Sequence, residues 1–249
     1  MASDGITTTY RIIRIPRASP RLADLVTKSR KTRLYALETD PASFLAQHAV
    51  ESALPLEVWS KRLSNPETTI LACVATNDSS NPDDETALIE EEWVGFAAVR
   101  GPMEYDDYYP SPDMNLPVPE NPREEARWHV YDLYTLPAHR GRGLAKRLMN
   151  SCILTAVEYT KALSVSSSPP PNPLQQARIR LFVNPKNTWV VKMYEGLGFR
   201  AAGKVTLDEG FRANALTESI PHNTRETEEL MALWHTRFGL AMEQIVRVG

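Results

Sequence analysis

The stretch whose residue types point most directly to chemistry is a short turn rich in glycine and arginine. Residues 139–148 read HRGRGLAKRL, with Gly141 and Gly143 directly before a helical pattern. At a helix start the backbone N–H groups lack partners within the helix, and the helix dipole adds positive charge. Glycine leaves room for a phosphate to approach these amides, and Arg140 and Arg142 add charge nearby. The turn predicts an anion site, although the four residues 140–143 alone fit a solvated surface loop equally well.

Two common phosphate-binding patterns do not fit this turn. The dinucleotide fingerprint G-x-G-x-x-G requires a third glycine where Lys146 stands, and the Walker loop requires Ser or Thr after its lysine, where Arg147 stands. A third pattern does fit. Arg140-x-x-Gly143-x-Ala145, preceded by a strand pattern and Pro137, resembles the R/Q-x-x-G-x-G/A pyrophosphate loop of the GNAT superfamily of acyl-CoA-dependent N-acetyltransferases.

A second motif meets a further requirement of the same family. GNAT enzymes usually follow this loop with another strand, an asparagine, and a helix that carries a tyrosine and ends in Gly-Phe. Residues 182–199 read FVNPKNTWVVKMYEGLGF, with Asn187 seven residues before Tyr194 and with Gly198 and Phe199 at the end. The resemblance covers mainly residues 128–200, and the early strands fit it more loosely.

The resemblance implies transfer of an acetyl group from acetyl-CoA to an amine. It places the pantetheine arm on the backbone amides of Leu133 and Thr135, and the pyrophosphate on the amides from Arg140 to Lys146. Threonine stands at 135 where the family usually has valine, and we expect little effect because the contact is made by the main chain. The residues assigned to the cofactor are Leu133, Tyr134, Thr135, Arg140, Gly141, Arg142, Gly143, Leu144, Ala145, Lys146 and Asn187.

The family pattern also assigns the proton donor. Tyr194 would protonate the departing CoA thiolate, because a phenol titrates near ~10 and is protonated at neutral pH. A half-buried core tyrosine beside Met193 and Leu197 is the structural alternative. Asn187 would contact the pantetheine arm, and its structural alternative is a helix N-cap, a position that asparagine favours.

The base that must deprotonate the amine is open between three candidates. His129 precedes Leu133 by four residues and lies on the same strand face, and a histidine titrates near ~6.5. Asp132 faces the other way in a regular strand, but this strand often carries a bulge in the family, which would turn the side chain. The third candidate is a water relay to Glu92 or to an acid of the loop that follows.

An acidic loop bears on the acceptor. Residues 101–127 carry seven acidic side chains against two arginines, together with Tyr105, Tyr108 and Tyr109. If these acids rim the acceptor side, they would attract a cationic amine, either a small molecule or a protein side chain. A solvated surface loop explains the composition equally well.

The remaining pattern supplies the elements that would hold these residues. Strand patterns cover 10–15, 69–75, 93–99, 128–136, 177–183, 199–205 and 229–235, and helical patterns cover 56–63, 143–156 and 187–196. Residues 77–87 form a polar turn pattern. We expect an α/β (α+β) fold of the GNAT type, with a mixed, mostly antiparallel twisted sheet of about six to seven strands flanked by helices. One domain would span 1–249, with inserted loops at about 101–127 and 164–176 and a C-terminal extension from about 206.

Composition excludes several classes of protein. The chain has 249 residues and a formal net charge of −3, which predicts no nucleic-acid partner. No stretch resembles a signal peptide or a span of ~18 apolar residues, so we expect a soluble, cytoplasmic protein with no membrane partner. No metal-ligand spacing occurs, and Cys73 and Cys152 are expected to be buried thiols.

The alternative to an acetyltransferase is a catalytically silent GNAT-fold protein that binds acyl-CoA or a protein partner. The pairing of Tyr194 with Asn187 favours the enzyme, since silent members often lose one of the two. The sequence leaves the acceptor amine and the oligomeric state open, and it is compatible with a dimer.

Overall fold

The computed structural model describes residues 8–77, 82–166, 174–237 and 239–248. The strands form one seven-stranded sheet in the order β1-β2-β3-β4-β5-β7-β6. Their bounds are β1 (Thr8–Arg14), β2 (Thr68–Asn77), β3 (Glu92–Arg100), β4 (Glu125–Thr135), β5 (Gln176–Val183), β6 (Arg200–Val205) and β7 (Gly239–Arg247). The pairs β1/β2, β5/β7 and β6/β7 are antiparallel, and β4 pairs with β5 in parallel.

Helices are distributed along the whole chain. The α-helices of the described residues are α1 (Leu22–Thr39), α2 (His48–Ser52), α3 (Leu56–Ser64), α4 (Asp84–Glu90), α5 (Tyr105–Tyr108), α6 (Leu144–Ser166), α7 (Thr188–Glu195), α8 (Leu207–Ala213) and α9 (Glu228–His235). Short 3-10 turns are η1 (Pro41–Ser43), η2 (Pro112–Met114), η3 (Pro122–Glu124), η4 (Pro137–His139) and η5 (Thr217–Ser219). The expected mixed, mostly antiparallel sheet flanked by helices is thereby confirmed.

The chain forms two compact units. The first comprises the residues up to Ala98 together with Asp132–Cys152, and the second comprises Val99–Tyr131 together with the residues from Ile153 onward. The single domain expected from the sequence stays a prediction.

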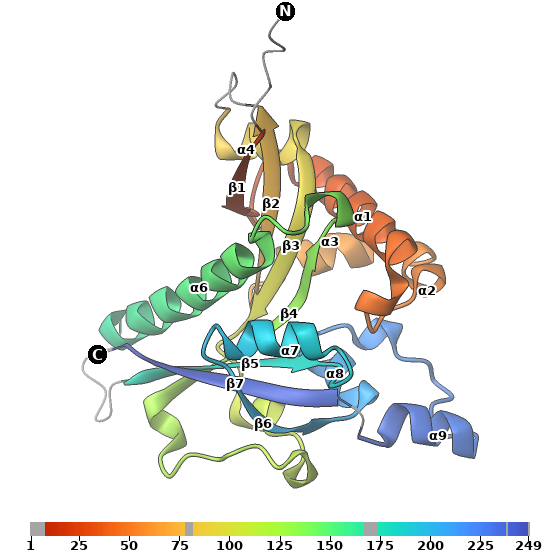
Figure 1. Ribbon diagram of the computed structural model, residues 1–249, viewed down its shortest axis with the longest axis vertical. Coiled ribbons are helices and arrows are strands. Elements are labelled where there is room, and N and C mark those ends of the chain that lie inside the picture. Colours follow the sequence, from red (N-terminus) through yellow and green to blue (C-terminus); the bar gives the residue numbers. More distant parts are fainter. Residues whose placement is uncertain (1–7, 78–81, 167–173, 238, 249) are drawn as a thin grey trace, which may run out of the picture. The chain divides into compact units, whose positions relative to one another are not determined.

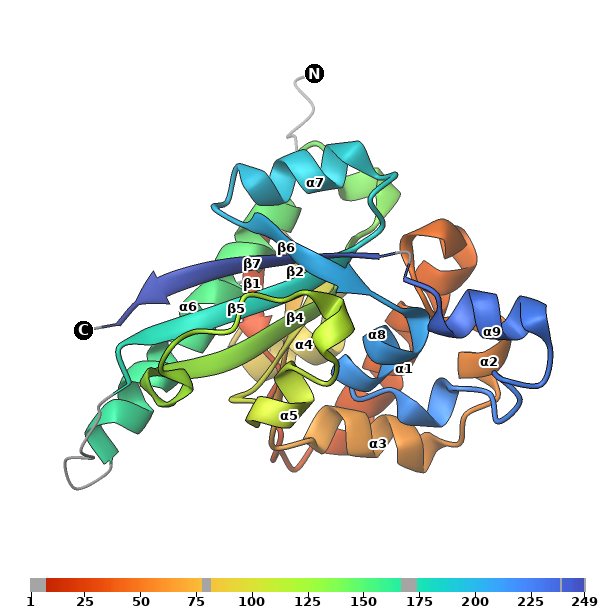
Figure 2. The same cartoon turned by 90° about the horizontal axis from the view of Figure 1, so that it is seen from below.

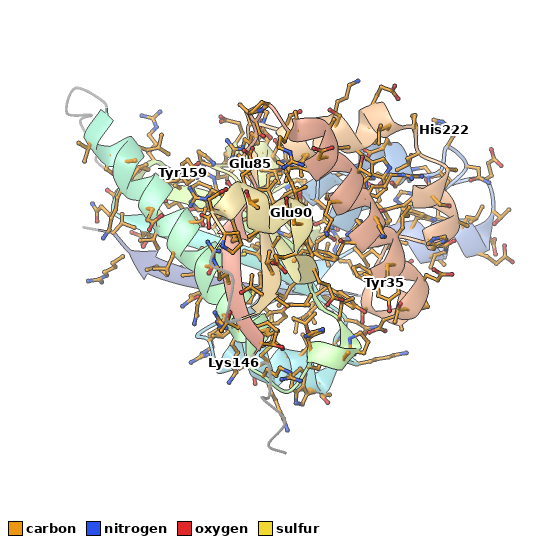
Figure 3. All side chains as sticks on the ribbon, turned by 90° about the horizontal axis from the view of Figure 1, so that it is seen from above. Tyr35, Glu85, Glu90, Lys146, Tyr159 and His222 are labelled. Carbon is orange, nitrogen blue, oxygen red and sulfur yellow. The ribbon has the colours of Figure 1, made fainter. Side chains whose placement is uncertain are left out.

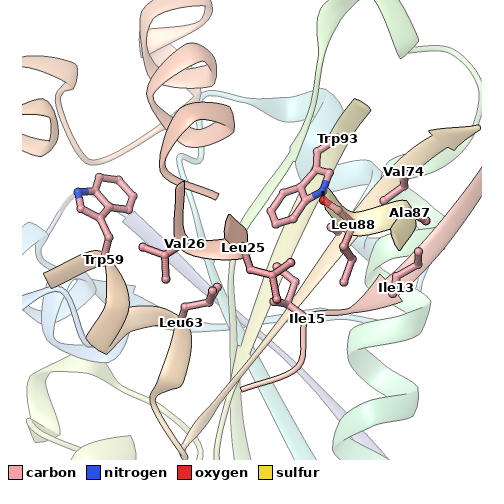
Figure 4. Packing of buried hydrophobic residues seen from close by; sticks show 11 residues of the cluster. Ile13, Ile15, Leu25, Val26, Trp59, Leu63, Val74, Ala87, Leu88 and Trp93 are labelled. Atoms are coloured by element: carbon pink, nitrogen blue, oxygen red, sulfur yellow. Dashed lines mark hydrogen bonds between the residues drawn. The ribbon is translucent and has the colours of Figure 1, made fainter. Parts of the chain in front are cut away.

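The first unit is built on an apolar core between its strands and the N-terminal helices. Helix α1 packs on α2, α3 and α4, and α3 also packs on β2 (Figure 1). Figure 4 shows the cluster that joins them, in which Leu25 of α1 and Leu88 of α4 are fully buried and Trp59 of α3 is 4% exposed. Burial of each such side chain contributes about 1.5–3 kcal/mol, so the cluster anchors α1 firmly.

The second unit is organised by β7, which pairs with β5 on one side and with β6 on the other. Helix α7 lies beside this part of the sheet (Figure 2). At Gly203 of β6 a Cβ atom would collide with the carbonyl oxygen of Met114. Glycine at this position therefore lets η2 approach the strand.

The C-terminal segment differs from the sequence pattern in two places. The strand expected at 229–235 is wrong, because these residues belong to α9, whose N-cap Thr227 accepts a hydrogen bond from the amide of Leu230. The strand of this segment is instead β7, which the pattern did not predict. The polar turn expected at 77–87 is wrong in its last part, because helix α4 begins at Asp84 and Asp83 is its N-cap. Residues 167–173 of the expected connector lie outside the described residues.

Two smaller expectations can be compared with the structure. Both cysteines are free and fully buried, as predicted. In the part of the chain that the structure describes, no helix is both long enough and apolar enough to cross a membrane.

Candidate functional site

The end of β4 departs from regular strand geometry at one residue. Asp132 has a φ of +56°, a left-handed conformation that side-chain-bearing residues seldom adopt. The parallel pairing of β4 with β5 runs from Glu125 opposite Gln176 to Val130 opposite Leu181. The backbone of β4 is therefore distorted directly before Leu133, where the resemblance allowed a bulge, and we call this distortion the Asp132 bulge.

A buried ion-pair cluster holds the Asp132 side chain. Arg33 of α1 places Nη1 2.7 Å from Asp132 Oδ2. The same guanidinium donates from Nε and Nη2 to both carboxylate oxygens of Glu51 in α2, at 2.7 and 2.9 Å. Arg62 of α3 lies 3.4 Å from Glu51 Oε2. One carboxylate oxygen of Asp132 is thus committed to Arg33, which is a constraint on any role as a base.

The electrostatics of the two carboxylates differ. Burial raises the pKa of Asp132, and the opposing charge of Arg33 does not fully offset that effect. Burial also pushes the pKa of Glu51 upward, but the charges of Arg33 and Arg62 outweigh it and the pKa is lowered. Glu51 is therefore the firmly ionised member of the cluster.

The glycine turn has the geometry of an anion cradle. Gly141 and Gly143 adopt φ angles of +77° and +75°, and helix α6 begins at Leu144. The first amide that bonds into the helix is that of Arg147, to the Gly143 carbonyl at 3.1 Å. Among the described residues, no backbone carbonyl accepts from the amides of 141–146. A Cβ atom added at either glycine would meet nothing within 4 Å, so the space before these amides is open.

The cationic side chains around the turn are not equivalent. Arg140 donates to the carbonyl oxygen of Thr135 at 3.1 Å and to Asp40 Oδ2 at 2.6 Å, which ties it to the end of α1. Its hydrogen bond holds the pKa of Asp40 below the usual value. Arg142 lies 5.9 Å from the ring of Tyr10, and Lys146 is exposed near the start of α6 (Figure 3). Arg140 thus orders the turn, whereas Arg142 and Lys146 supply exposed charge.

The remaining cofactor candidates of the first unit line the same stretch of chain. Leu133 is partly buried, and Tyr134, Thr135 and Leu144 are buried. The Tyr134 hydroxyl is buried, and the Arg140 guanidinium lies 5.4 Å from the centre of the Tyr134 ring. Its ring packs on Phe44 with centroids 4.9 Å apart, which links the strand to the segment after α1.

Helix α7 carries the second motif. The side chain of Asn187 caps the helix by accepting from the amide of Val190 at 3.4 Å. Tyr194 is 7% exposed, and its ring lies 6.0 Å from that of Phe199. The structural alternative for Asn187 is therefore realised, and Tyr194 combines near-complete burial with a packed ring.

His129 lies in a buried polar setting within the second unit. It is fully buried, its Nε2 lies 2.9 Å from Asn214 Oδ1, and its ring is 4.7 Å from that of Phe182. Its Nδ1 has no partner among the described residues. Burial, reinforced by the charge of Arg180, lowers the pKa of His129 well below its usual value. The ring is therefore neutral at physiological pH.

This pKa shift predicts a pH dependence of stability. Below the unfolded-state pKa of about 6.5 the unfolded chain binds a proton that the native ring does not, so stability falls by about 1.4 kcal/mol per pH unit. We expect His129→Gln to remove this component. Between about pH 7 and pH 5, urea unfolding of wild type should lose about 2 kcal/mol more than unfolding of the variant.

Replacement of the exposed His222, labelled in Figure 3, by glutamine serves as the control. Equal pH slopes for wild type and His129→Gln would show that the native ring titrates normally.

Only some of the acidic side chains in the loop at 101–127 are exposed. Glu125 is buried in β4 and pairs with Arg178 at 2.7 Å, and Asp107 lies 3.5 Å from Arg100. The acids that remain exposed in this loop are Glu104, Asp106, Asp107, Asp113 and Glu120.

The predicted site residues fall into two groups. Asp132 and the cofactor residues from Leu133 to Lys146 belong to the first unit, and His129, Asn187 and Tyr194 belong to the second. The sequence pattern missed the residues that fix these groups, which are Arg33, Asp40, Glu51 and Asn214. No local signal marks them, because their partners are 18 to 100 residues away.

Part of the chain matches a known protein family. Residues 82–201 match the family model of the acetyltransferase (GNAT) domain. Residues 82–201 therefore match the GNAT acetyltransferase family that the two motifs resemble.

Several solved structures are similar to the chain at low sequence identity. A putative acetyltransferase from Acinetobacter baylyi has 15% identity and a TM-score of 0.50, with 99% of this chain and 95% of that chain covered. NAA60 from Arabidopsis thaliana, in complex with a bisubstrate analogue, has 17% identity and a TM-score of 0.48, with 98% and 100% covered. Ribosomal-protein-alanine N-acetyltransferase from Brucella melitensis has 15% identity and a TM-score of 0.46, with 95% and 99% covered. No curated protein matches the chain.

Proposed function

We propose that this protein transfers an acetyl group from acetyl-CoA to a primary amine by direct attack in a ternary complex. The observation that carries the proposal is the cradle at residues 141–146. Its amides have no backbone acceptor among the described residues, and they precede a helix of 23 residues whose dipole favours an anion. Both glycines are exposed, and a Cβ atom at either would meet nothing within 4 Å, so the turn is open to an anion from solvent.

Different residues of the chain would bind the cofactor and transfer the protons. The amides from Arg140 to Lys146 bind the pyrophosphate, and those of Leu133 and Thr135 orient the pantetheine arm. Asn187, whose oxygen caps α7, presents its amide group to the same arm. Acetyl-CoA supplies an activated thioester carbonyl. Tyr194 donates its phenolic proton to the sulfur of the leaving thiolate, which makes expulsion favourable.

Removal of the amine proton is assigned to His129, Asp132 or a water relay. His129 is neutral and its Nδ1 is available as an acceptor, but its ring is fully buried. Asp132 is partly exposed, with a side chain at 20%, but one oxygen is held by Arg33. His129 is thus in the protonation state that a base requires but is shielded from solvent. Asp132 is accessible but is paired with Arg33.

The acceptor is proposed to be a cationic amine. The exposed acids of the 101–127 loop provide the attraction, which is long-ranged and screened by salt. A panel of a polyamine, an aminoglycoside and a lysine peptide, read out as thiol release from acetyl-CoA, tests the function. At least one amine should accelerate release above hydrolysis, and its N-acetylated form should not.

Failure of every amine, with acetyl-CoA binding intact, would instead support the catalytically silent alternative. Weaker acceleration at high salt would support the electrostatic role of the loop.

A further inference from the structure

The left-handed backbone at Asp132 is uncommon for a residue with a side chain, although aspartate adopts it more readily than most such residues. For most residues with a side chain this conformation is disfavoured by roughly five- to thirtyfold relative to the ordinary alternatives, and for aspartate by less. Asp132 adopts φ +56° inside an 11-residue strand, immediately before Leu133. A contact that holds the Asp132 side chain would therefore stabilise this conformation further.

The Arg33 side chain supplies a rigid connection to the bulge. Two of its nitrogens donate to both oxygens of Glu51, and Nη1 of the same planar guanidinium forms an ion pair with Asp132 Oδ2, 2.7 Å away. The Arg33 side chain is 9% exposed and that of Glu51 is fully buried, so solvent screens the pairs little. Phe44 lies 5.4 Å from the guanidinium and completes its enclosure.

Glu51 has no part in the proposed chemistry, yet it is a fully buried carboxylate with two arginines. Arg62 contacts its Oε2 from α3, so all three N-terminal helices converge on the cluster. A buried ion cluster of this kind is poor evidence for stability by itself, because its desolvation penalty offsets much of the attraction. Its geometric effect is specific, since it reaches one side chain of β4 at the distorted residue.

We propose that Arg33 and Glu51 are positioning residues for acetyl-CoA, which act by clasping Asp132 and so holding the bulge that orients the Leu133 amide. The inference rests on the proposed function, because the resemblance assigns that amide to the cofactor. It also gives Asp132 a positioning role and leaves proton removal to His129 or a water relay. The N-terminal helices thereby contribute to cofactor binding through the strand.

The substitution Asp132→Gly tests the clasp directly. Glycine populates positive φ freely, so a strand with glycine at this position does not depend on Arg33 to keep the bulge. We expect Arg33→Met to weaken acetyl-CoA binding about tenfold in calorimetry, and Asp132→Gly to change it less than about threefold. Arg33→Met in the Asp132→Gly background should cause little further loss.

Three companion measurements separate the clasp from other effects. Arg21→Met changes an exposed arginine that pairs with Asp24 at 3.0 Å, and it should leave binding unchanged. Arg33→Lys keeps the charge without the planar fork, so it should weaken binding as Arg33→Met does even if the latter variant folds poorly. Amide hydrogen exchange at Leu133 should accelerate in Arg33→Met but not in Asp132→Gly.

The outcomes distinguish the two proposals. A wild type that binds acetyl-CoA, with Arg33→Met and Arg33→Lys binding equally well, overturns the clasp alone. Additive losses in the double variant overturn it as well, because they show that Arg33 does not act through Asp132. Loss of turnover in Asp132→Gly with full turnover in Arg33→Lys would make Asp132 the base instead. A wild type that does not bind overturns both proposals.

Discussion

Replacing Tyr194 by phenylalanine is expected to lower kcat about a hundredfold or more, while changing the Kd for acetyl-CoA little. The hydroxyl is the group that the proposed mechanism uses, and phenylalanine removes it while keeping the ring. Because Tyr194 is only 7% exposed and packs on Phe199, the retained ring should keep α7 in place. Thiol-release kinetics and acetyl-CoA calorimetry on the same preparations measure the two quantities separately.

Tyr35→Phe provides the matched control, because this tyrosine is 54% exposed on α1 (Figure 3). It should retain the wild-type kcat. If Tyr194→Phe also retains kcat, Tyr194 is a core residue and the proton reaches the thiolate by another route. A loss of acetyl-CoA affinity equal to the loss of kcat/KM would instead mean that the hydroxyl acts in binding.

Replacing Arg178 by methionine is expected to lower the free energy of unfolding by about 3–5 kcal/mol. Arg178 of β5 joins two buried carboxylates, with Nε 2.7 Å from Glu125 of β4 and Nη1 2.8 Å from Glu243 of β7. Their side chains are 0% and 5% exposed, so removal of the guanidinium leaves two acids in a poorly solvated place. Urea unfolding at neutral pH measures the loss.

The acidic loop depends on the same cluster. The Tyr108 hydroxyl donates to Glu243 at 2.8 Å, and burial raises the pKa of Glu243 despite its contact with Arg178. Arg212→Met, which breaks an exposed pair with Asp208 at 2.8 Å, should change the unfolding free energy by no more than about 0.5 kcal/mol. A loss below about 1 kcal/mol in Arg178→Met would show that water or protonation relieves the buried carboxylates.

Patterns of short range predicted most of the sheet. Runs such as 93–99 and 177–183 combine aliphatic and aromatic residues, and they form most of β3 and β5. The tight turn at Gly141 and Gly143 was also predictable, because its left-handed backbone depends on residues within one short segment.

The C-terminal strand shows where such patterns fail. Residues 229–235 are apolar enough for either a strand or a helix, and the capping Thr227 with Glu228 and Glu229 in the first turn decides for the helix. Strand β7 is fixed by pairing with β5 and β6, which are distant in sequence. Its buried Glu243 looks unlike a core residue until Arg178 is placed beside it.

The site was predictable only in part for the same reason. Resemblance supplied Tyr194, Asn187 and the loop from Arg140, each within a local motif. The clasp on Asp132 combines residues 33, 51 and 132, whose relation exists only in the folded chain. Likewise the neutral state of His129 depends on Arg180 and Asn214, which belong to other elements.

Titration of acetyl-CoA into wild type, Gly143→Asp and Gly143→Asn tests whether the glycine turn before α6 binds the pyrophosphate. Asparagine tolerates the left-handed backbone at 143, so it serves as the uncharged match for aspartate. We expect saturable binding to wild type, at least tenfold weaker binding to Gly143→Asp, and a smaller loss of affinity in Gly143→Asn. Equal affinity in all three proteins, or no binding by wild type, would contradict an acetyl-CoA site at the start of α6.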